Sequence, residues 1–454
     1  MLGGRVKTLH PRIHAGILAR RDLAEDTATL AEHEIEPIDL VCVSLYPFAS
    51  VAGRPGVSEA EIVEMIDVGG PSMLRAAAKN FAHVTAVSSW EQYEEVLAEL
   101  HEHGEVRGET RRRLAHRAFA ATAEYDAAIA KWFADEPFPE QLTIALRKVT
   151  DLSYGENPHQ AAAYYSETGA RRHLLSYVEQ LGGKELSYNN LVDLEGARRV
   201  EREFAEPTVV IVKHANPCGV AVAETIEEAW ERALAADPVS AFGCVAILNR
   251  PVGAELGARI AEHFVEVLHA PAYDDAAVEA LRTRKALRIL RDGERRAETP
   301  GERDVKRVLG GLLVQERDDG VDERAGMEVV VGALDDAQWE DVLFAWRVCR
   351  HVSSNAIVLA RGLQTIGIGA GQMSRVDAVR IAVEKAREHG HETRGAVLAS
   401  DAFFPFADGP QLALEAGVAV VAQPGGSRRD EEVVETVRAA GAAMVFTGRR
   451  HFRH

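Results

Sequence analysis

Lys213 and His214 are adjacent titratable residues that stand where an apolar run ends. Val209 to Val212 is β-branched and uncharged, which is typical of a buried strand. Asn216-Pro217 follows the pair and predicts a turn. Because ligands of open α/β sheets bind at the carboxyl ends of the strands, an imidazole and an ammonium here indicate proton transfer beside developing negative charge. The alternative is a solvated pair that only ends a strand.

A second candidate site is the glycine turn Asp67-Val-Gly-Gly-Pro71, which predicts the start of a helix with Pro71 at its first position. Two glycines before a helix expose backbone N–H groups, which suit a phosphate or an oxyanion. Arg75 and Lys79 are four residues apart and therefore share a face of that helix. The alternative for this pair is an exposed basic face. The basic segment 5–11, which also ends in a turn, offers a site of the same kind.

Two segments in the second half of the chain have the composition of a ligand-contacting loop. Residues 365–375 predict a strand, a glycine-rich loop and a helix, with Arg375 as an anion partner. The G-x-G-x-x-G register that begins at Gly369 meets Ser374, so we expect no nicotinamide site. Residues 400–408 place three phenylalanines around a proline, either as a slot for a flat heterocycle or as core packing. Residues 424–429 combine turn glycines with two arginines and predict an anion cradle.

Composition excludes several classes of partner. The 454 residues carry 52 Lys and Arg against 70 Asp and Glu, a net charge of −18, which argues against a nucleic-acid or anionic-membrane surface. The length predicts two or three domains. No apolar run has the length of a membrane span, and the N-terminus lacks the core of a signal peptide. An anionic ligand must therefore be held by local clusters of cations.

The cysteines and histidines do not form a metal site. The four cysteines lie far apart without a C-x-x-C pair, which fits a reducing cytoplasm and excludes a disulfide framework. Zinc deaminases need H-x-E with P-C-x-x-C, but Asn216 and Ala221 stand at the deciding positions beside Pro217-Cys218. We therefore expect no zinc.

The alternation of patterns predicts α/β folding with parallel sheets. Expected strands are 37–48, 84–88, 209–212, 244–248, 356–360, 365–368, 396–399 and 418–421. Expected helices are 58–66, a helix that begins at Pro71, most of 90–133, then 226–236, 253–268, 335–349, 376–389 and 430–440. Residues 135–139 are the expected linker, and the charged stretch 282–307 is expected to be a surface excursion. The apolar run 442–446 and Phe452 indicate that the C-terminal tail is packed.

These segments together resemble the bifunctional purine-biosynthesis family that joins AICAR transformylase to IMP cyclohydrolase. The matching stretches are Arg5-Val-Lys-Thr-Leu-His-Pro, Leu45-Tyr-Pro-Phe, Asp67-Val-Gly-Gly-Pro, Ala76-Ala-Ala-Lys-Asn, Tyr154-Gly-Glu-Asn-Pro-His-Gln, Lys184-Glu-Leu-Ser-Tyr-Asn-Asn, Lys213-His-Ala-Asn-Pro-Cys-Gly, Gly367-Ile-Gly-Ala-Gly-Gln-Met-Ser-Arg, Asp401-Ala-Phe-Phe-Pro-Phe and the closing His-Phe-Arg-His. The resemblance implies a methylglyoxal-synthase-like cyclohydrolase domain over 1–134 and a transformylase region of two cytidine-deaminase-like α/β/α units over 140–454. It also implies a homodimer with shared transformylase sites, and 10-formyltetrahydrofolate as co-substrate.

The resemblance assigns roles to single residues in both activities. For the transformylase it implies catalytic roles for Lys213, His214 and Asn355, with His214 as the base. It implies contacts to the ribonucleotide from Tyr154, Gly243, Glu266 and Arg450, and a folate side lined by Arg375, Phe403, Asp408, Ser427 and Arg428. For the cyclohydrolase it implies catalytic roles for Lys79, Tyr46 and Asp67, with substrate contacts from Lys7, Thr8, Gly69 and Gly70.

The chain departs from the family pattern at its start and at two later positions, one in each domain. The family begins about sixty residues earlier, with a strand and a loop that grip the nucleotide phosphate. Ser44 and Ser153 stand where the family has Asn and Arg, and loss of a bidentate Arg weakens a phosphate site. From the missing N-terminal segment we expect poor cyclisation of formyl-AICAR, and from Ser153 we expect weaker ribonucleotide binding, with formyl transfer retained. The rival interpretation is a non-catalytic nucleotide-binding or dimer-scaffold paralogue, and a nicotinamide-dependent enzyme ranks third.

Overall fold

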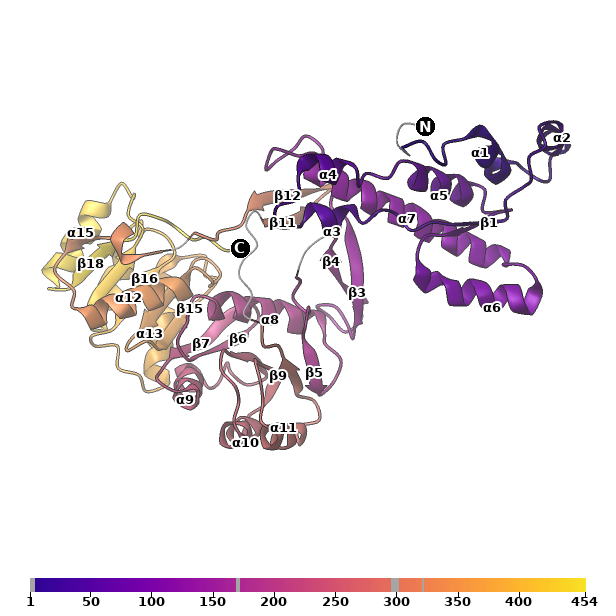
Figure 1. Ribbon diagram of the computed structural model, residues 1–454. Coiled ribbons are helices and arrows are strands. Elements are labelled where there is room, and N and C mark those ends of the chain that lie inside the picture. Colours follow the sequence, from indigo (N-terminus) through magenta and orange to yellow (C-terminus); the bar gives the residue numbers. More distant parts are fainter. Residues whose placement is uncertain (1–4, 169–171, 295–301, 321) are drawn as a thin grey trace. The chain divides into compact units, whose positions relative to one another are not determined.

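The structure is a computed structural model that describes residues 5–168, 172–294, 302–320 and 322–454 (Figure 1). The chain divides into two compact units. The first comprises Met1–Val149 with Tyr165–His173, and the second comprises Thr150–Tyr164 with Leu174–His454. The expected linker 135–139 lies inside the first unit. No helix in the described ranges combines the length and apolar character needed to cross a membrane.

The first unit is mainly helical around one parallel strand pair. Its elements are α1 (Pro11–Leu18), α2 (Ala24–Glu32), β1 (Leu40–Cys42), α3 (Phe48–Ala52), α4 (Glu59–Val63), α5 (Gly69–Lys79), β2 (Thr85–Val87), the 3₁₀ turn η2 (Trp90–Gln92), α6 (Tyr93–His103) and α7 (Gly108–Phe133). Strands β1 and β2 pair in parallel, with Leu40 opposite Thr85. The fully buried Leu74 of α5 packs with Val84 and Ala86 beneath this pair. Helix α5 therefore forms part of the core and carries the Gly69-Gly70 turn at its start.

Two details of the first unit differ from the expectation. Only Leu40–Cys42 of the expected strand 37–48 is extended and paired. Helix α5 begins at Gly69, so Pro71 is its third residue. The carboxylate of Asp67, which precedes the N-cap residue Val68, accepts the backbone N–H of Gly70 at 2.8 Å and so pairs one free N–H of the first turn.

The second unit contains two six-stranded sheets of identical topology. Strands β3 (Leu146–Leu152) and β4 (Ala162–Glu167) form a separate pair that both units share. The first sheet has the order β5-β10-β9-β8-β6-β7 and the second has the order β13-β18-β17-β16-β14-β15. In each sheet the three strands in the middle of the order are parallel, and the first strand and the last two run antiparallel to their neighbours. The prediction of parallel sheets is therefore only partly confirmed, because each sheet is mixed.

The elements of the two sheets follow one another in the same order along the chain. The first set is β5 (Glu179–Gly182), α8 (Tyr188–Glu201), β6 (Thr208–Lys213), β7 (Asn216–Val222), α9 (Ile226–Ala236), β8 (Cys244–Leu248), α10 (Ala254–Glu262), β9 (Val265–Ala270), α11 (Asp275–Arg282) and β10 (Arg288–Arg291). The second set is β13 (Glu328–Val331), α12 (Asp336–Cys349), β14 (Ile357–Ala360), β15 (Thr365–Gly369), α13 (Arg375–Glu388), β16 (Val397–Ser400), α14 (Asp408–Glu415), β17 (Val420–Gln423), α15 (Asp430–Ala439) and β18 (Ala443–Phe446). The hairpin β11 (Arg303–Val308) and β12 (Gly311–Glu316) and the 3₁₀ turn η3 (Arg324–Gly326) lie between the sets.

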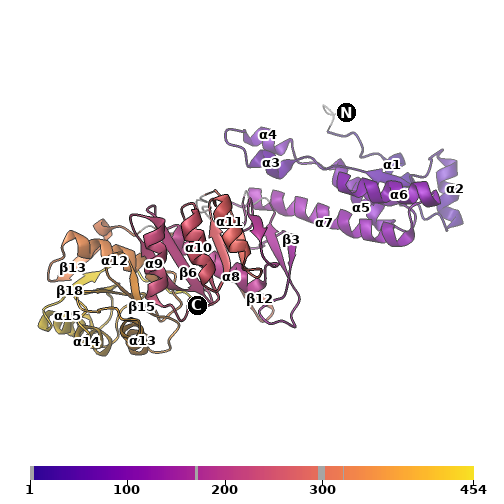
Figure 2. The same ribbon diagram turned by 90° about the horizontal axis from the view of Figure 1, so that it is seen from below.

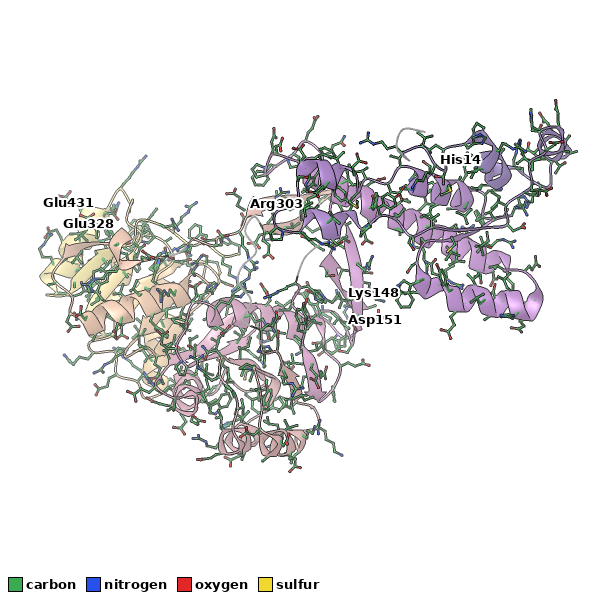
Figure 3. The ribbon with its side chains drawn as sticks, viewed as in Figure 1. His14, Lys148, Asp151, Arg303, Glu328 and Glu431 are labelled. Carbon is green, nitrogen blue, oxygen red and sulfur yellow. The ribbon has the colours of Figure 1, made fainter. Side chains whose placement is uncertain are left out.

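Each sheet is covered by helices on both faces. Helices α8 and α12 share one apolar core with the facing sides of both sheets, where Leu194 and Trp346 are fully buried. Helices α9, α10 and α11 cover the other face of the first sheet, and α13, α14 and α15 cover that of the second (Figure 2). Glu328 lies on β13, the edge strand of the second sheet, and Glu431 lies on α15, which packs against that strand (Figure 3). The second unit is thus two α/β/α layers joined through α8 and α12.

The secondary structure predicted from sequence patterns is wrong at two places in the first sheet. The expected helix 253–268 ends at Glu262, and the strand β9 follows it. The expected surface excursion 282–307 contains β10, whose Arg288, Ile289 and Leu290 are buried in the sheet. Residues 295–301 of that stretch lie outside the described residues. The prediction of a surface excursion is therefore wrong for its first part.

Candidate active site

Lys213 and His214 lie at a tight hairpin between β6 and β7. Lys213 is the last residue of β6, and it pairs with Asn216, the first residue of β7. His214 and Ala215 form the turn with φ values of 52° and 60°. This left-handed conformation costs non-glycine residues of order 1 kcal/mol each. The predicted turn at Asn216-Pro217 is therefore two residues too late, and the turn takes His214 out of the alternation of strand side chains.

The two side chains of the pair have different surroundings. The Lys213 ammonium donates to the carbonyl oxygens of Phe242 and Gly243 at 3.0 and 2.6 Å. These two bonds leave one of its three donors for a ligand. His214 is exposed at the tip of the turn. The backbone thus points the imidazole outward and holds the ammonium beside the Gly243 loop.

Three polar side chains hold the hairpin turn in place. The buried Asp193 of α8 accepts the backbone N–H of Ala215 at 2.6 Å. Arg453 donates to the carbonyl oxygen of Ala215 at 3.0 Å. The side-chain amide of Asn216 donates to the carbonyl oxygen of His214 at 3.1 Å. Burial raises the pKa of Asp193, although the Ala215 N–H and the nearby His214 lower it. The fold therefore offsets the cost of the left-handed turn with hydrogen bonds from three elements.

A cavity of about 550 Å³ opens at this edge of the first sheet. It is lined by Ser153, Tyr154, Lys184, Glu185, Phe264, Glu266, Ala286 and Arg288. A Cβ placed on Gly243 would lie 3.0 Å from the Lys213 ammonium and 3.0 Å from the Phe264 ring, so the cavity adjoins the Lys213 site. Glu266 accepts the amide of Asn190 at 3.1 Å. The structure thus brings Tyr154, Gly243 and Glu266 together.

The position of the cavity in the sheet differs from the expectation. Strand β6 runs antiparallel to β8, so the carboxyl end of β6 meets the amino ends of β8, β9 and β10. Gly243, Phe264 and Arg288 therefore come from the starts of parallel strands. The rule that ligands bind at carboxyl ends holds here only for the strand that carries Lys213.

Asn355 belongs to a buried polar network at the end of the second sheet. Arg375 donates to the amide oxygen of Asn355 at 2.6 Å and to the Ser400 hydroxyl at 2.9 Å, and it pairs with the fully buried Asp401. The amide of Asn355 donates to the carbonyl oxygens of Gln372 and Met373. Arg375 therefore has protein partners on both terminal nitrogens and orients Asn355, while its predicted contact with folate stays a prediction.

The residues expected on the folate side lie around the ends of β16 and β17. Phe404 is buried in the core, whereas Phe403 and Phe406 are exposed, and the Arg429 guanidinium lies 4.8 Å from the Phe406 ring centre. Asp408 is the first residue of α14. Arg428 is exposed, and the Ser427 hydroxyl accepts the Arg429 N–H at 3.2 Å.

The expected anion cradle at 424–429 is occupied by the chain itself. The Asp430 carboxylate accepts the backbone N–H groups of Gly426 and Ser427 at 2.6 and 3.0 Å. An external anion would have to displace this carboxylate. The N–H groups of Gly426 and Ser427 are therefore already paired, and the prediction that Arg428 and Arg429 hold an anion stays a prediction.

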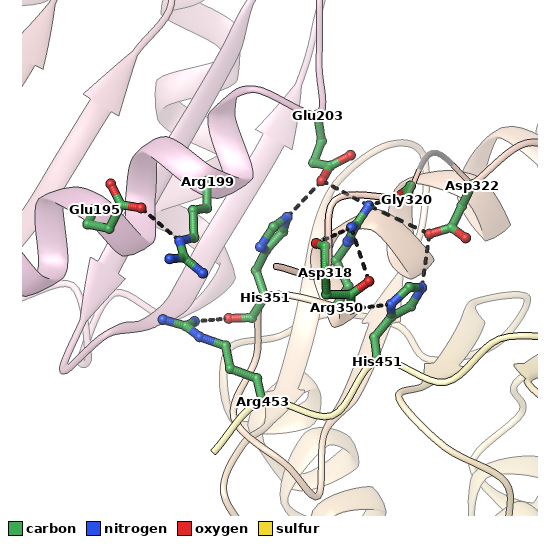
Figure 4. Close-up of polar contacts among 10 residues, drawn as sticks. All are labelled: Glu195, Arg199, Glu203, Asp318, Gly320, Asp322, Arg350, His351, His451 and Arg453. Carbon is green, nitrogen blue, oxygen red and sulfur yellow. Dashed lines mark hydrogen bonds and ion pairs between the residues drawn. The ribbon is translucent and has the colours of Figure 1, made fainter. Parts of the chain in front are cut away.

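The C-terminal tail is packed, as predicted, but through a charged network (Figure 4) and not through Phe452, which is exposed. His451 is buried between Asp318 and Asp322, and both carboxylates raise its pKa against the effect of burial. Arg453 donates to the His351 carbonyl oxygen as well as to Ala215. Arg450, expected to contact the ribonucleotide, is exposed and lies over the Phe452 ring at 4.8 Å. The tail thus reaches the turn that carries His214.

His351 pairs with Glu203 in the same network. Its ring nitrogen lies 2.8 Å from the Glu203 carboxylate. Burial lowers the pKa of His351 to about 4, although Glu203 acts in the opposite direction. His351 is therefore neutral at physiological pH.

The first unit gathers part of the expected cyclohydrolase set at the start of α5. A Cβ on Gly69 would lie 2.2 Å from the Thr8 hydroxyl, and one on Gly70 would lie 2.3 Å from the Asp67 carboxylate. Only glycines therefore allow Thr8 and Asp67 to approach this turn. Lys7 is exposed beside Thr8.

Tyr125 extends this site and was not predicted from the sequence. Its hydroxyl accepts the Asp67 N–H at 2.8 Å and donates to the Met65 carbonyl oxygen at 2.7 Å. Burial raises the pKa of Tyr125, the hydrogen bond from the Asp67 N–H lowers it, and the charge of Asp67 raises it again. Lys79 ends α5 ten residues after Gly69, which is about 15 Å along the helix. The structure therefore groups Thr8, Asp67 and the glycines with Tyr125, and leaves Lys79 at the other end of α5. The place of Tyr46 in this set stays a prediction.

Sequence reasoning missed Asp193, Arg453 and Tyr125 because each acts on a residue distant in the chain. No group of three or more His, Cys, Asp or Glu side chains with the geometry of a metal site was found among the described residues.

Comparison with known proteins gives a consistent match. Residues 77–385 match the family model described as "AICARFT/IMPCHase bienzyme". A protein of Halalkalibacterium halodurans named bifunctional purine biosynthesis protein PurH is 48% identical over all of this chain, which covers 89% of that protein. A PurH of Sorangium cellulosum is 50% identical with the same coverage. The solved structure of ForH, 43% identical over 29% of this chain and 68% of its own, superposes with a TM-score of 0.27.

Proposed function

We propose, on the premise that this chain belongs to the AICARFT/IMPCHase bienzyme family, that its two reactions take place at the β6–β7 hairpin and at the start of α5. The chain transfers a formyl group to AICAR and closes the ring of formyl-AICAR to IMP, two steps of purine biosynthesis. The observation that carries the assignment of the first site is the hairpin turn. It places His214 directly after Lys213, whose ammonium lies at the Gly243 loop beside a cavity large enough for a ribonucleotide.

Formyl transfer at this site uses His214 as base and Lys213 as the source of positive charge. The 5-amino nitrogen of AICAR attacks the formyl carbon of 10-formyltetrahydrofolate, and the new C–N bond forms as the amine proton passes to His214. The third donor of the Lys213 ammonium stabilises the oxyanion that develops on the formyl group. The bond from that carbon to the folate nitrogen then breaks, and the folate nitrogen takes a proton from the imidazolium.

Asn355 and the residues around it orient the reactants. Arg375 fixes the Asn355 amide and thereby serves as a positioning residue. Tyr154, Gly243, Glu266 and Arg450 contact the ribonucleotide in this proposal. Phe403, Asp408, Ser427 and Arg428 serve the folate, with the exposed Phe403 ring stacking on the pterin.

Ring closure uses the site at the start of α5. An amide nitrogen attacks the formyl carbon and water leaves, so the site must bind an anionic nucleotide and move two protons. The glycine turn with Lys7 and Thr8 binds the substrate, and Asp67 and Tyr46 handle the protons. Lys79 is the weakest member of the set, because it lies at the far end of α5, about 15 Å along the helix from Gly69.

The shared topology of the two sheets supports a pair of cytidine-deaminase-like units, preceded by a methylglyoxal-synthase-like domain. We propose that the enzyme works without zinc, in the cytoplasm and as a homodimer with shared transformylase sites.

Replacement of His214 by Gln tests the proposed transformylase site. Loss of a general base costs about 10²- to 10⁴-fold in turnover. Cyclisation of formyl-AICAR in the same preparation is the internal control and should not change. Formyl transfer at the wild-type rate would refute the role of His214. Binding of AICAR without any turnover by the wild-type chain would favour the rival interpretation of a non-catalytic paralogue.

Replacement of Asp67 by Asn tests the second site in the same way. We expect cyclisation to fall by about 10²-fold or more, with formyl transfer unchanged. The expectation of poor cyclisation by the wild-type chain is tested in the same assay, by comparing its turnover of formyl-AICAR with that of AICAR.

A further inference from the structure

Arg288 differs from the other buried arginines in the described part of the chain. Arg198, Arg350 and Arg375 are also buried, and each pairs with at least one carboxylate. Arg288 is only 8% exposed, and no carboxylate of the described residues lies within ion-pair distance of it. A buried charge without a counter-charge is costly, because it has lost its hydration and gained no ionic partner. This arrangement is typical of a cation that awaits an anionic ligand.

The Arg288 guanidinium is oriented by two backbone carbonyl groups. Its Nε donates to the carbonyl oxygen of Glu185 at 3.0 Å, and one terminal nitrogen donates to that of Ala286 at 3.4 Å. A guanidinium has five N–H donors, so most of them are left for another partner. Arg288 lines the cavity of about 550 Å³ next to Lys213. The guanidinium is thus held in one orientation with unused donors at a cavity, which suits bidentate recognition of an oxyanion.

Lys184 supplies a second positive charge in the same cavity. It is exposed, and its ammonium has no hydrogen-bond or ionic partner in the described ranges. The net charge of −18 gives the chain no general attraction for anions, so such a pair of cations acts locally.

We propose that Arg288, assisted by Lys184, binds the 5′-phosphate of the AICAR ribonucleotide. The proposal rests on the proposed transformylase function and adds two residues that the family resemblance does not assign to the substrate. The cavity favours a nucleotide because Glu266 and Glu185 lie in its wall as acceptors for ribose hydroxyl groups.

Substitution of Arg288 by Gln tests the proposal, because the amide can keep the hydrogen bond to Glu185. Calorimetry with the full chain should show about 10- to 100-fold weaker binding of AICAR ribonucleotide, the worth of a charge-assisted contact. Affinity for the corresponding nucleoside and the KM for 10-formyltetrahydrofolate should not change. Arg291→Gln is the matched control, because Arg291 lies on the same strand but is exposed and paired with Glu179.

Three results would overturn the proposal. These are unchanged ribonucleotide affinity, an equal loss for nucleoside and ribonucleotide, and a rise in the folate KM alone, which would assign the cations to the folate carboxylates. If Arg288→Gln fails to fold, Lys184→Gln decides, because an exposed side chain is not needed for folding and its loss must still weaken ribonucleotide binding selectively. A phosphate-selective loss together with full activity of His214→Gln would leave the anion site standing and refute the transformylase mechanism instead.

Discussion

The two halves of the second unit each contain an equivalent hairpin, but the residues at the turn differ. In the first half the turn between β6 and β7 is His214-Ala215, and in the second half the turn between β14 and β15 is Gly362-Leu363. All four residues have positive φ values between 52° and 60°. Lys213 precedes the first turn, and Arg361 precedes the second. The scaffold therefore provides this turn twice, and only one copy carries an imidazole.

The supports of the two turns also correspond. Asp193 is the sixth residue of α8 and Asp341 is the sixth residue of α12, and each carboxylate accepts backbone N–H groups of its turn. An arginine donates to a carbonyl oxygen of each turn, Arg453 in the first and Arg232 in the second. The geometry of the turn is thus a property of the fold, while the chemistry depends on which side chains it presents.

The halves meet through residues at equivalent positions. Glu203 lies ten residues after Asp193, His351 lies ten residues after Asp341, and the two side chains pair at 2.8 Å. The spacing of 148 residues between 193 and 341 recurs between 214 and 362 and between 203 and 351. The polar contact between the halves therefore includes a repeated position that became acidic in one copy and basic in the other.

Removal of the two supporting carboxylates should give the largest difference in kcat between variants of the two halves. Asp193→Ala and Asp341→Ala each remove the acceptor of partly buried N–H groups and should destabilise the protein by about 1–3 kcal/mol. Only Asp193→Ala should also lower the kcat of formyl transfer per folded molecule, by about 10- to 100-fold, since His214 loses its fixed backbone. Thermal melting and steady-state kinetics on both variants check this. An equal loss of kcat in both would contradict the different roles of the two turns.

The pair formed by His351 and Glu203 predicts a pH dependence of stability. Burial lowers the pKa of His351 to about 4 from about 6.5, so the folded protein binds fewer protons than the unfolded chain in this range. This contribution to stability is present above pH 6.5 and is lost as the pH falls toward 4. Between pH 7 and pH 5 the loss is about 2 kcal/mol.

Denaturant unfolding of wild type and His351→Gln at both pH values measures that contribution. The amide of Gln can still donate to Glu203 but does not titrate, so the variant should lose about 2 kcal/mol less than wild type. Parallel pH profiles for the two proteins would show that His351 is not the titrating group.

Substitution of the arginines that hold the turns should give the smallest difference in kcat between the two halves. Arg453→Ala removes the donor to the Ala215 carbonyl oxygen and should reduce kcat by about 5- to 10-fold, the value of a single hydrogen bond. Arg232→Ala removes the corresponding donor in the second half and should leave kcat unchanged. Steady-state kinetics with both substrates at saturation would distinguish a loss of positioning from weaker binding. A larger effect from Arg232→Ala would reverse the assignment of the active half.

Local patterns predicted most elements of the second unit because burial there follows short apolar runs. Residues 209–212, 244–248 and 396–399 are confirmed as strands for this reason. Strand β9 was missed because its apolar residues continue the pattern of the preceding helix. Strand β10 was missed because its four residues lie within a charged stretch, and only pairing with β9 and β5 makes them extended.

The details of the site depended on contacts that no local pattern contains. The turn at His214-Ala215 needs the carboxylate of Asp193, which lies in a different helix, so the sequence indicated the turn two residues too late. The uncompensated charge of Arg288 is visible only when its surroundings are known. A comparison of the chain with itself at a spacing of 148 residues would have aligned Asp193 with Asp341 and could have found both turns.

Chemical rescue of His214→Gly tests the central claim most directly, because this variant gives the first turn the glycine that the second turn has. Formyl transfer should fall by about 10²- to 10⁴-fold, and added imidazole should restore part of it with a dependence on the concentration of neutral imidazole. The cyclohydrolase reaction of the same sample should respond to neither change. Formyl transfer that persists in His214→Gly without imidazole would contradict the account.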